Sequence, residues 1–300
     1  MHIAIYGGDT AGVALEDVIA AARVAEEQGF HGFYLPQIFG LDPLITLAMI
    51  GREVSRIELG TTVVPTYTHH PMTLAQQALT VNLATGGRFV LGVGLSHQFV
   101  IEAMYGLSFD RPLRHMREYL SVLLPLIRDG AVSYEGETIR TNTAIDIAGR
   151  SACPVVLAAL GPRMLELAGG VADGTVTWMT GPATLADHTI PTINEAAESA
   201  GRAAPVVAAA LPVCVADDVE TSREWANAEY AMYGMLPSYR AMLDREGAAG
   251  PGDVAITGDE AAVTAQIEGL AEIGVTTFAA AEYGPPEART RTRELLRSLL

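Results

Sequence analysis

Lysine is absent from this chain of 300 residues, and all 19 of its basic residues are arginine. Lysine is the amine that forms Schiff bases, and it is the usual phosphate ligand of a P-loop. Its absence excludes a Schiff-base aldolase, a pyridoxal-phosphate enzyme and an ordinary Walker-A nucleotidase.

Cysteine and long apolar runs are also scarce. Cys153 and Cys214 allow at most one disulfide bond. The longest apolar run, residues 205–216, is interrupted by Pro212 and is far shorter than the roughly 20 residues of a membrane-spanning helix. The opening residues MHIAIYGGD lack the basic and apolar regions of a secretory signal. We therefore expect a cytoplasmic protein with free, buried thiols.

Positive charge is in short supply, because 35 acidic residues give the chain a net charge of −16. Nucleic acids and anionic membranes both need a concentrated positive field on their protein partner. The acidic charge balance therefore argues against nucleic acids and anionic membranes as partners. It favours a small-molecule substrate. Apolar residues make up 49% of the chain, enough for a substantial core.

Short apolar runs alternate with amphipathic segments along the whole chain, and no linker divides it. Strands are expected over residues 2–6, 32–36, 57–64, 88–94, 154–158, 174–179, 206–215 and 275–280. Eight strands alternating with helices predict an α/β fold, a (β/α)8 TIM barrel in one domain of residues 1–300. Short insertions are expected as a β excursion over residues 132–147 and a loop over residues 247–258.

An open, doubly wound sheet is the alternative architecture. Its dinucleotide-binding fingerprint needs glycines in the first turn at the spacing G-x-G-x-x-G. Here Gly7, Gly8 and Gly12 follow the first strand, but Asp9 occupies the position of the second glycine. The fingerprint fails, which disfavours an NAD-dependent dehydrogenase.

In a barrel of this kind the active site lies at the carboxyl ends of the strands. The polar or conformationally special residues there are Asp9, Gln37, Thr61, Thr62, Tyr67, His69, His70, Ser96, His97, Gln98, Gly161, Arg163, Trp178 and Thr180. A single carboxylate gives no acid/base pair, and no metal-binding or nucleophile-elbow motif occurs, so we expect no metal site. Hydroxyls, amides and imidazoles around an apolar pocket suit a large planar cofactor that brings its own reactivity.

Individual residues keep alternative interpretations. Arg163 follows Gly161-Pro162 at a helix start, where free N–H groups and a guanidinium could hold a phosphate, or where Gly-Pro simply starts the helix. His69 and His70 could contact a ligand or cap the next helix. His97 is the best candidate for a proton donor, because it follows a strand in the loop opened by Gly94.

The segments LGTTVVPTYTHHP and GGRFVLGVGLSH, together with GFHGFYLPQIFGLDPL, FDRPLRHMREYL and CPVVLAALGPRMLELAGGVADGTVTWM, resemble the bacterial-luciferase-like superfamily. The resemblance is to its branch of deazaflavin (coenzyme F420)-dependent oxidoreductases. It implies a barrel with the cofactor at its carboxyl-end mouth, hydride transfer at C5 of the deazaflavin, and a homodimer. It also implies a cis peptide bond between Thr62 and Val63.

Carried over from the family, Thr62, Val63 and the loop from Gly94 through Ser96 to His97 would hold the ring. The segment Leu160, Gly161, Pro162 and Arg163 would bind the ribityl phosphate region. Gln37, Ala159, Trp178 and Met179 complete the expected cofactor contacts, and His97 is the expected catalytic residue.

The chain also departs from the family pattern. An acid–histidine pair that follows the second strand in well-known members is Gln37 and Ile38 here. His97 stands where the sugar-phosphate dehydrogenase branch has a glutamate, and the lysines that this branch uses for substrate phosphate are absent. Glucose-6-phosphate oxidation is therefore disfavoured. The alternatives are an FMN-dependent luciferase-like monooxygenase and a non-catalytic cofactor-binding member of the fold.

Overall fold

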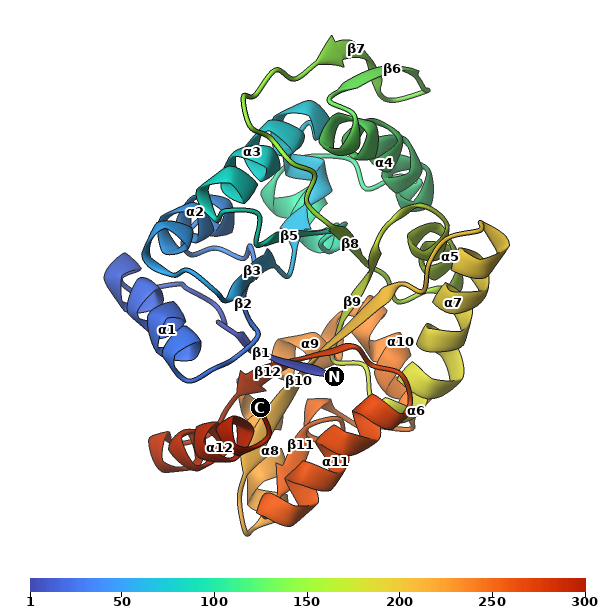
Figure 1. Ribbon diagram of the computed structural model, residues 1–300. Coiled ribbons are helices and arrows are strands. Elements are labelled where there is room, and N and C mark those ends of the chain that lie inside the picture. The colour runs from blue at the N-terminus through green and yellow to red at the C-terminus, as the bar shows by residue number, and fades with distance from the viewer.

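The computed structural model describes all 300 residues, and its central feature is a closed barrel of eight parallel strands (Figure 1). The barrel strands, in order around the ring, are β1 (His2–Tyr6), β2 (Gly32–Leu35), β3 (Glu58–Thr61), β5 (Phe89–Gly94), β8 (Val155–Ala158), β9 (Gly174–Trp178), β10 (Val206–Val215) and β12 (Thr277–Glu282). Pairing of β12 with β1 and of β9 with β10 closes the ring. The predicted TIM barrel is therefore confirmed.

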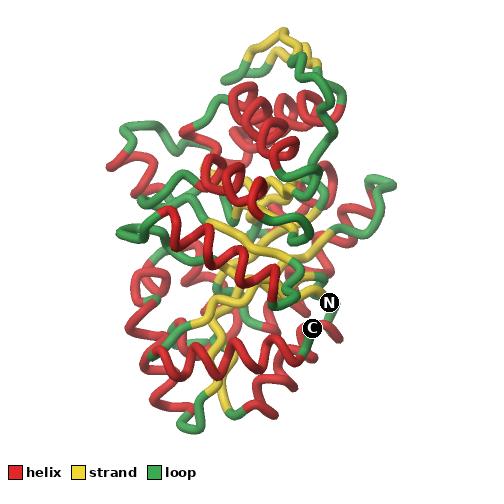
Figure 2. The backbone as a smooth tube through the Cα atoms, turned by 60° about the vertical axis from the view of Figure 1, so that its left-hand side comes forward, coloured by secondary structure: helices red, strands yellow, loops and turns green.

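Helices surround the barrel, as the tube in Figure 2 shows. The long ones are α1 (Leu15–Glu27), α2 (Pro43–Glu53), α3 (Pro71–Ala84), α4 (Pro112–Arg128), α5 (Pro162–Val171), α7 (Ile190–Ser199), α8 (Val219–Glu229), α10 (Pro237–Glu246), α11 (Glu260–Glu272) and α12 (Pro286–Ser298). Shorter turns are η1 (Thr66–Thr68), η2 (Val100–Met104), α6 (Pro182–Thr184), η3 (Leu185–Thr189), α9 (Ala231–Met235) and η4 (Pro251–Asp253). None of these helices combines the length and apolarity needed to cross a lipid bilayer.

Local sequence explains where several helices begin and end. A proline occupies the first turn of α2, α3, α4 and α5, where its missing N–H costs no hydrogen bond. The Asp42 carboxylate accepts a hydrogen bond from the Ile45 N–H and so caps α2. Gly29 takes a φ of 92° directly after α1, a conformation that glycine adopts without strain.

Two regions differ from the sequence prediction. The expected loop over residues 247–258 contains η4 and a short strand, β11 (Ile256–Gly258), which extends the barrel sheet by pairing with the end of β10. A single helix was expected over residues 219–233, but this segment divides into α8 and α9, and the α10 that follows was not predicted. The expected β excursion is confirmed as an antiparallel hairpin of β6 (Ala131–Glu135) and β7 (Arg140–Ala144), which projects from the body of the molecule (Figure 2).

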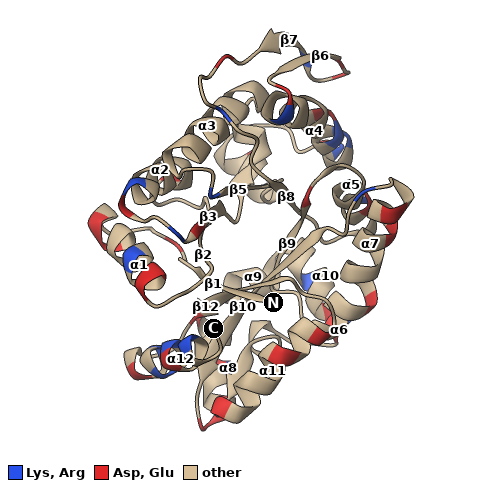
Figure 3. Ribbon diagram, in the orientation of Figure 1, with Lys and Arg blue, Asp and Glu red and all other residues tan.

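The main core lies between the strands and the helices. One cluster of 56 buried residues packs there, including Phe33, Leu59, Leu91 and Phe278. Inside the barrel a small cluster combines Ala4, Ala210 and Ala279 with Tyr34, which donates a hydrogen bond to the Glu58 carboxylate at 2.6 Å. Charged residues gather on the outer helices, most visibly on α1, α11 and α12 (Figure 3).

Glu118 of α4 fastens the β6–β7 hairpin to the helical layer. Its carboxylate is buried and accepts hydrogen bonds from the Thr138 hydroxyl at 2.7 Å and from the backbone N–H groups of residues 137–139. Burial raises the pKa of Glu118, but these hydrogen bonds outweigh it and hold the pKa at about 2. The carboxylate form is therefore the one that the fold stabilises.

We expect Glu118→Gln to lower the free energy of unfolding by about 1–2 kcal/mol at neutral pH, because the charge-assisted hydrogen bonds are weakened. A depressed pKa stabilises the fold above the unfolded value near 4.5 and loses that contribution as the pH falls toward 2. Urea unfolding between pH 7 and 3 measures both effects. The exposed Glu135→Gln is the control; equal losses in the two variants would contradict this role for Glu118.

Candidate active site

A cavity of about 870 Å³ opens at the carboxyl ends of the barrel strands. Its walls come from residues at or just after the ends of β2, β3, β5, β8 and β9, together with η2, α9 and α10. A space of this size is in the range of sites that bind cofactors and drug-sized ligands. The mouth of the barrel is thus where the structure concentrates its binding capacity, as the fold class predicts.

Of the 13 cofactor contacts that the family resemblance implies, 11 meet at this cavity, whereas the strand-end residues Asp9, Thr61, Tyr67, Gln98 and Thr180 do not line it. Those that line it are Gln37, Thr62, Val63, Gly94, Ser96, His97, Leu160, Gly161, Pro162, Arg163 and Trp178. They come from segments up to 141 positions apart in the chain (37 to 178). The barrel topology brings them together because every parallel strand ends at the same rim.

Ala159 and Met179 do not line the cavity and are a correction to the expected set. Ala159 is buried in the main core. Met179 is completely buried and packs with Leu243 and Val254 behind the cavity wall. Each follows a lining residue at the end of a strand, Ala158 or Trp178, where successive side chains point to opposite faces.

His69 and His70 lie outside the cavity lining and make local contacts. His70 is the N-cap of α3, and its Nδ1 accepts a hydrogen bond from the Met72 N–H at 3.2 Å. The His69 ring lies 3.1 Å from the Pro65 carbonyl oxygen. Capping and loop geometry account for both residues.

The floor of the cavity is shaped by close backbone packing. The peptide bond between Thr62 and Val63 is cis, as the family resemblance implies, and β4 (Val64–Pro65) continues from it to pair with β5. A Cβ atom on Gly94 would lie 2.6 Å from Val63 Cγ2, so only glycine fits there. These residues form a surface made largely of backbone and apolar atoms, suited to the face of a planar ring.

Four buried polar atoms of the lining residues have no hydrogen-bond partner. They are Gln37 Oε1, Thr62 Oγ1, Thr177 Oγ1 and Trp178 Nε1. Leaving a buried polar atom unpaired costs about 1–3 kcal/mol, so native proteins rarely keep several in one place. Donors and acceptors together on the wall fit a ligand with a polar ring edge, which is the chemistry of a flavin or deazaflavin.

The start of α5 offers a second kind of contact at the edge of the cavity. Gly161 is the N-cap of α5, and no side chain caps the helix. Helix N-termini with free N–H groups attract anions, and Arg163 stands in the first turn. His188 Nε2 lies 2.9 Å from the Leu160 carbonyl oxygen. A carbonyl can only accept, so His188 Nε2 donates and holds this loop in place.

An aromatic wall that was not anticipated from the sequence completes the cavity. Tyr6 stacks on Trp178 with ring centroids 5.1 Å apart, and Tyr233 meets Trp178 edge-on at 5.6 Å. Tyr239 of α10 packs against Tyr233 at 5.4 Å. Burial raises the pKa of both Tyr6 and Tyr239, so both phenols stay protonated at neutral pH. The signal in the sequence was the run of tyrosines at 230, 233 and 239, which helical spacing alone does not assign to a site.

His97 lines the cavity next to the aromatic wall. Its imidazole and the Tyr239 ring have centroids 5.4 Å apart. It is the only histidine among the lining residues, which include no carboxylate. Burial lowers its pKa below the usual value of 6.5, so the ring is mainly neutral at pH 7. A neutral imidazole has one hydrogen-bond donor and one acceptor nitrogen, so it can act as a base, and the protonated ring can act as an acid.

A sequence comparison decides the family. The model of the family described as luciferase-like monooxygenase matches residues 3–288. The chain belongs to the luciferase-like monooxygenase family. Its homologues include F420-dependent oxidoreductases.

Two relatives illustrate this membership. The 5,10-methylenetetrahydromethanopterin reductase of Methanopyrus kandleri is 27% identical over 302 residues, covering 85% of this chain and 85% of the relative. The F420-dependent glucose-6-phosphate dehydrogenase of Nakamurella multipartita is 29% identical over 240 residues, covering 74% of this chain and 70% of the relative.

Solved structures of the luciferase-like fold agree with the barrel. The coenzyme F420 dependent tetrahydromethanopterin reductase from Methanopyrus kandleri superposes with a TM-score of 0.80 at 24% identity, covering 99% of this chain and 96% of that one. The FMN complex of a type II Baeyer-Villiger monooxygenase from Pseudomonas putida gives 0.79 at 16% identity, covering 99% and 96%. The fold therefore accommodates either class of enzyme.

Proposed function

We propose that this luciferase-like protein is an F420-dependent oxidoreductase that transfers a hydride between the deazaflavin and a small organic substrate. The observation that carries the proposal is the set of partnerless polar atoms around an apolar, backbone-rich cavity floor. These groups can bind and orient a polar ring edge. Two of the relatives named above support the deazaflavin in particular, through the F420-dependent activities in their names.

The positions of the lining residues suggest which part of the cofactor each would contact. Gln37, Thr62 and Trp178 would hydrogen-bond the ring edge, Gly94 and Val63 would support its face, and Leu160 to Arg163 would hold the phosphate. Bound there, a deazaflavin supplies the hydride chemistry at its C5 atom. The chain contributes binding, orientation and the exclusion of water.

The substrate side of the cavity favours an uncharged, apolar molecule. Tyr6, Trp178, Tyr233 and Tyr239 present aromatic surface, and no carboxylate lines the cavity to balance a cationic substrate. Arg163 is the only arginine in the lining. It would bind the cofactor phosphate and would therefore not be available to an anionic substrate. His97 stands beside this wall as the proposed proton donor in reduction, or acceptor in oxidation.

Cofactor choice is tested by anaerobic fluorescence titration with F420 and with FMN. We expect F420 to bind at least about tenfold more tightly than FMN. Tighter binding of FMN would instead favour the FMN-dependent monooxygenase, an alternative that the Pseudomonas structure supports. Reduced F420 is then tested against a panel of enones, imines and alcohols. Binding without any turnover would point to a non-catalytic member of the fold.

A further inference from the structure

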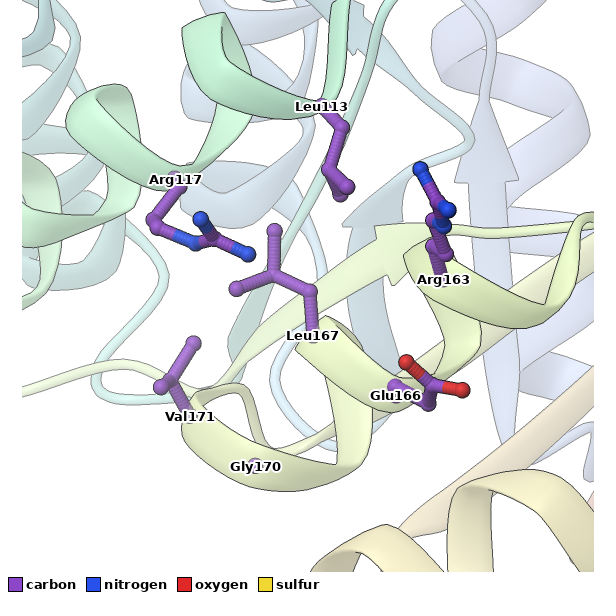
Figure 4. Close-up of a pocket in the computed structure, with 7 residues that line it drawn as sticks. All are labelled: Leu113, Arg117, Arg163, Glu166, Leu167, Gly170 and Val171. Carbon is purple, nitrogen blue, oxygen red and sulfur yellow. The ribbon is translucent and has the colours of Figure 1, made fainter.

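A second, smaller groove adjoins the mouth of the barrel between α4 and α5 (Figure 4). It has a volume of about 540 Å³, and Leu113 and Leu167 form its apolar floor. Leu113 and Arg163 line both this groove and the cofactor cavity. The two spaces therefore meet at Arg163, beside the start of α5.

Two arginines with no protein partner flank the groove. Arg117 reaches from α4 toward Leu167, and Arg163 rises from the first turn of α5 (Figure 4). Neither guanidinium makes an ion pair or a side-chain hydrogen bond, although nine of the 19 arginines in the chain are ion-paired. Glu166 is the only carboxylate among the lining residues.

This charge pattern runs against the rest of the molecule. The chain carries a net charge of −16, yet here two arginines without partners and a single carboxylate line one groove. The surface beyond Arg163 also has room, because a Cβ atom on Gly170 would meet no atom within 4 Å. An extended anionic chain that leaves the cavity past Arg163 would find both arginines and an apolar floor along its path.

We propose that the groove between α4 and α5 binds the acidic tail of the cofactor, with Arg117 as the residue that reads it. The inference rests on the proposed function. Coenzyme F420 continues beyond its phosphate into a chain of glutamate residues, whereas FMN ends at the phosphate. The groove would therefore contribute to the choice of F420 over FMN, as well as to affinity.

The test compares two ligands that differ only in the tail. F420 with several glutamates and the form with none are titrated by deazaflavin fluorescence. Wild type is expected to bind the tailed form about fivefold more tightly. Arg117→Gln should remove about threefold of that gain and leave the tail-free affinity unchanged, because an exposed ion pair contributes about 1 kcal/mol or less.

Glu166→Gln should have the opposite effect. Removing the groove's carboxylate should raise the affinity for the tailed ligand about twofold and leave the affinity for the tail-free ligand unchanged. The matched control is Arg52→Gln, another exposed arginine without a partner, in the last turn of α2 before β3 begins. It should change neither affinity. The tail-dependent gain should also shrink as salt rises, because exposed charges are screened.

Equal affinity of wild type for the two ligands would overturn the tail site and leave the proposed function standing. The same conclusion would follow if Arg117→Gln weakened both ligands equally or neither. Failure of wild type to bind either deazaflavin would instead overturn the proposed function itself. Circular dichroism on each variant checks that the exposed substitutions leave the fold intact.

Discussion

His97→Gln is expected to lower kcat/KM for hydride transfer about hundredfold while changing deazaflavin affinity by less than threefold. General acid–base catalysis typically contributes a factor of this size or larger. His97 lines the cavity as its only histidine, and its ring packs near Tyr239. Glutamine keeps a polar side chain of similar reach, but it cannot exchange a proton near neutral pH.

The dependence of kcat/KM on pH shows whether His97 acts as an acid or as a base. Burial lowers the pKa of His97 below 6.5, so the protonated ring is lost as the pH rises through that lowered value. If the enzyme reduces its substrate, His97 acts as an acid, and kcat/KM falls with rising pH. If the enzyme oxidises its substrate, the neutral ring acts as a base, and kcat/KM falls with falling pH. This fall in kcat/KM should be absent when the pH dependence of His97→Gln is measured.

His31→Gln is the matched control for this prediction. Burial lowers the pKa of His31 as well, but His31 stacks on His2 just before β2 begins, at the amino end of the barrel. Its replacement should leave kcat/KM and the pH profile unchanged. A pH limb that survives in His97→Gln, or disappears in His31→Gln, would remove His97 from the chemistry.

The barrel was predictable because its signals are local. Each strand is a short apolar run bounded by glycine, proline or polar residues, and each following helix begins at a recognisable proline or N-cap such as Asp42-Pro43. The rim residues could then be named because parallel strands end at one edge. For this reason the sequence alone predicts that Gln37, His97 and Arg163 lie at one site.

The parts that were missed depend on tertiary contacts. Gly234 and Pro237 interrupt the segment that forms α9 and α10, and its apolar side chains find their partners on Trp178, more than 50 positions earlier. No periodicity within the segment reveals that contact. The three-residue β11 forms only because the end of β10 is available to pair with it. Similarly, Arg117 and Arg163 line the same groove only because α4 and α5 pack beside each other.

Side-chain direction is a second limit. The family pattern selects segments, and Ala159 and Met179 were therefore expected at the site along with their neighbours. Met179 in fact takes a φ of 53° and packs into a buried cluster with Leu243. In contrast, Tyr6 ends β1 with its ring stacked on Trp178, a direction that depends on the partner from another strand.

Gly161→Asp is expected to weaken F420 binding about hundredfold without lowering the stability of the protein. Gly161 is the N-cap of α5 in an extended conformation (φ −79°, ψ 154°) that any residue adopts. A Cβ atom there would meet no atom within 4 Å. Aspartate is also among the preferred N-cap residues, so the unfolding midpoint should stay constant or rise slightly.

The loss of affinity has two electrostatic causes. The new carboxylate would accept hydrogen bonds from the first-turn N–H groups that are proposed to receive the phosphate. It would also repel the phosphate. Two like charges about 4 Å apart repel each other by about 1 kcal/mol in water and by about 4 kcal/mol near a protein surface. A combined cost of about 2.7 kcal/mol corresponds to a hundredfold change in the dissociation constant.

Gly161→Asn separates charge from shape. Asparagine has the same size and is an equally good N-cap, but it carries no charge. It should therefore compete for the N–H groups without the repulsion and weaken F420 by less than about tenfold. Fluorescence titration of both variants, with thermal unfolding of each, makes the comparison. If Gly161→Asp binds F420 as tightly as wild type, the phosphate does not lie at the start of α5, and Arg163 loses its proposed role there.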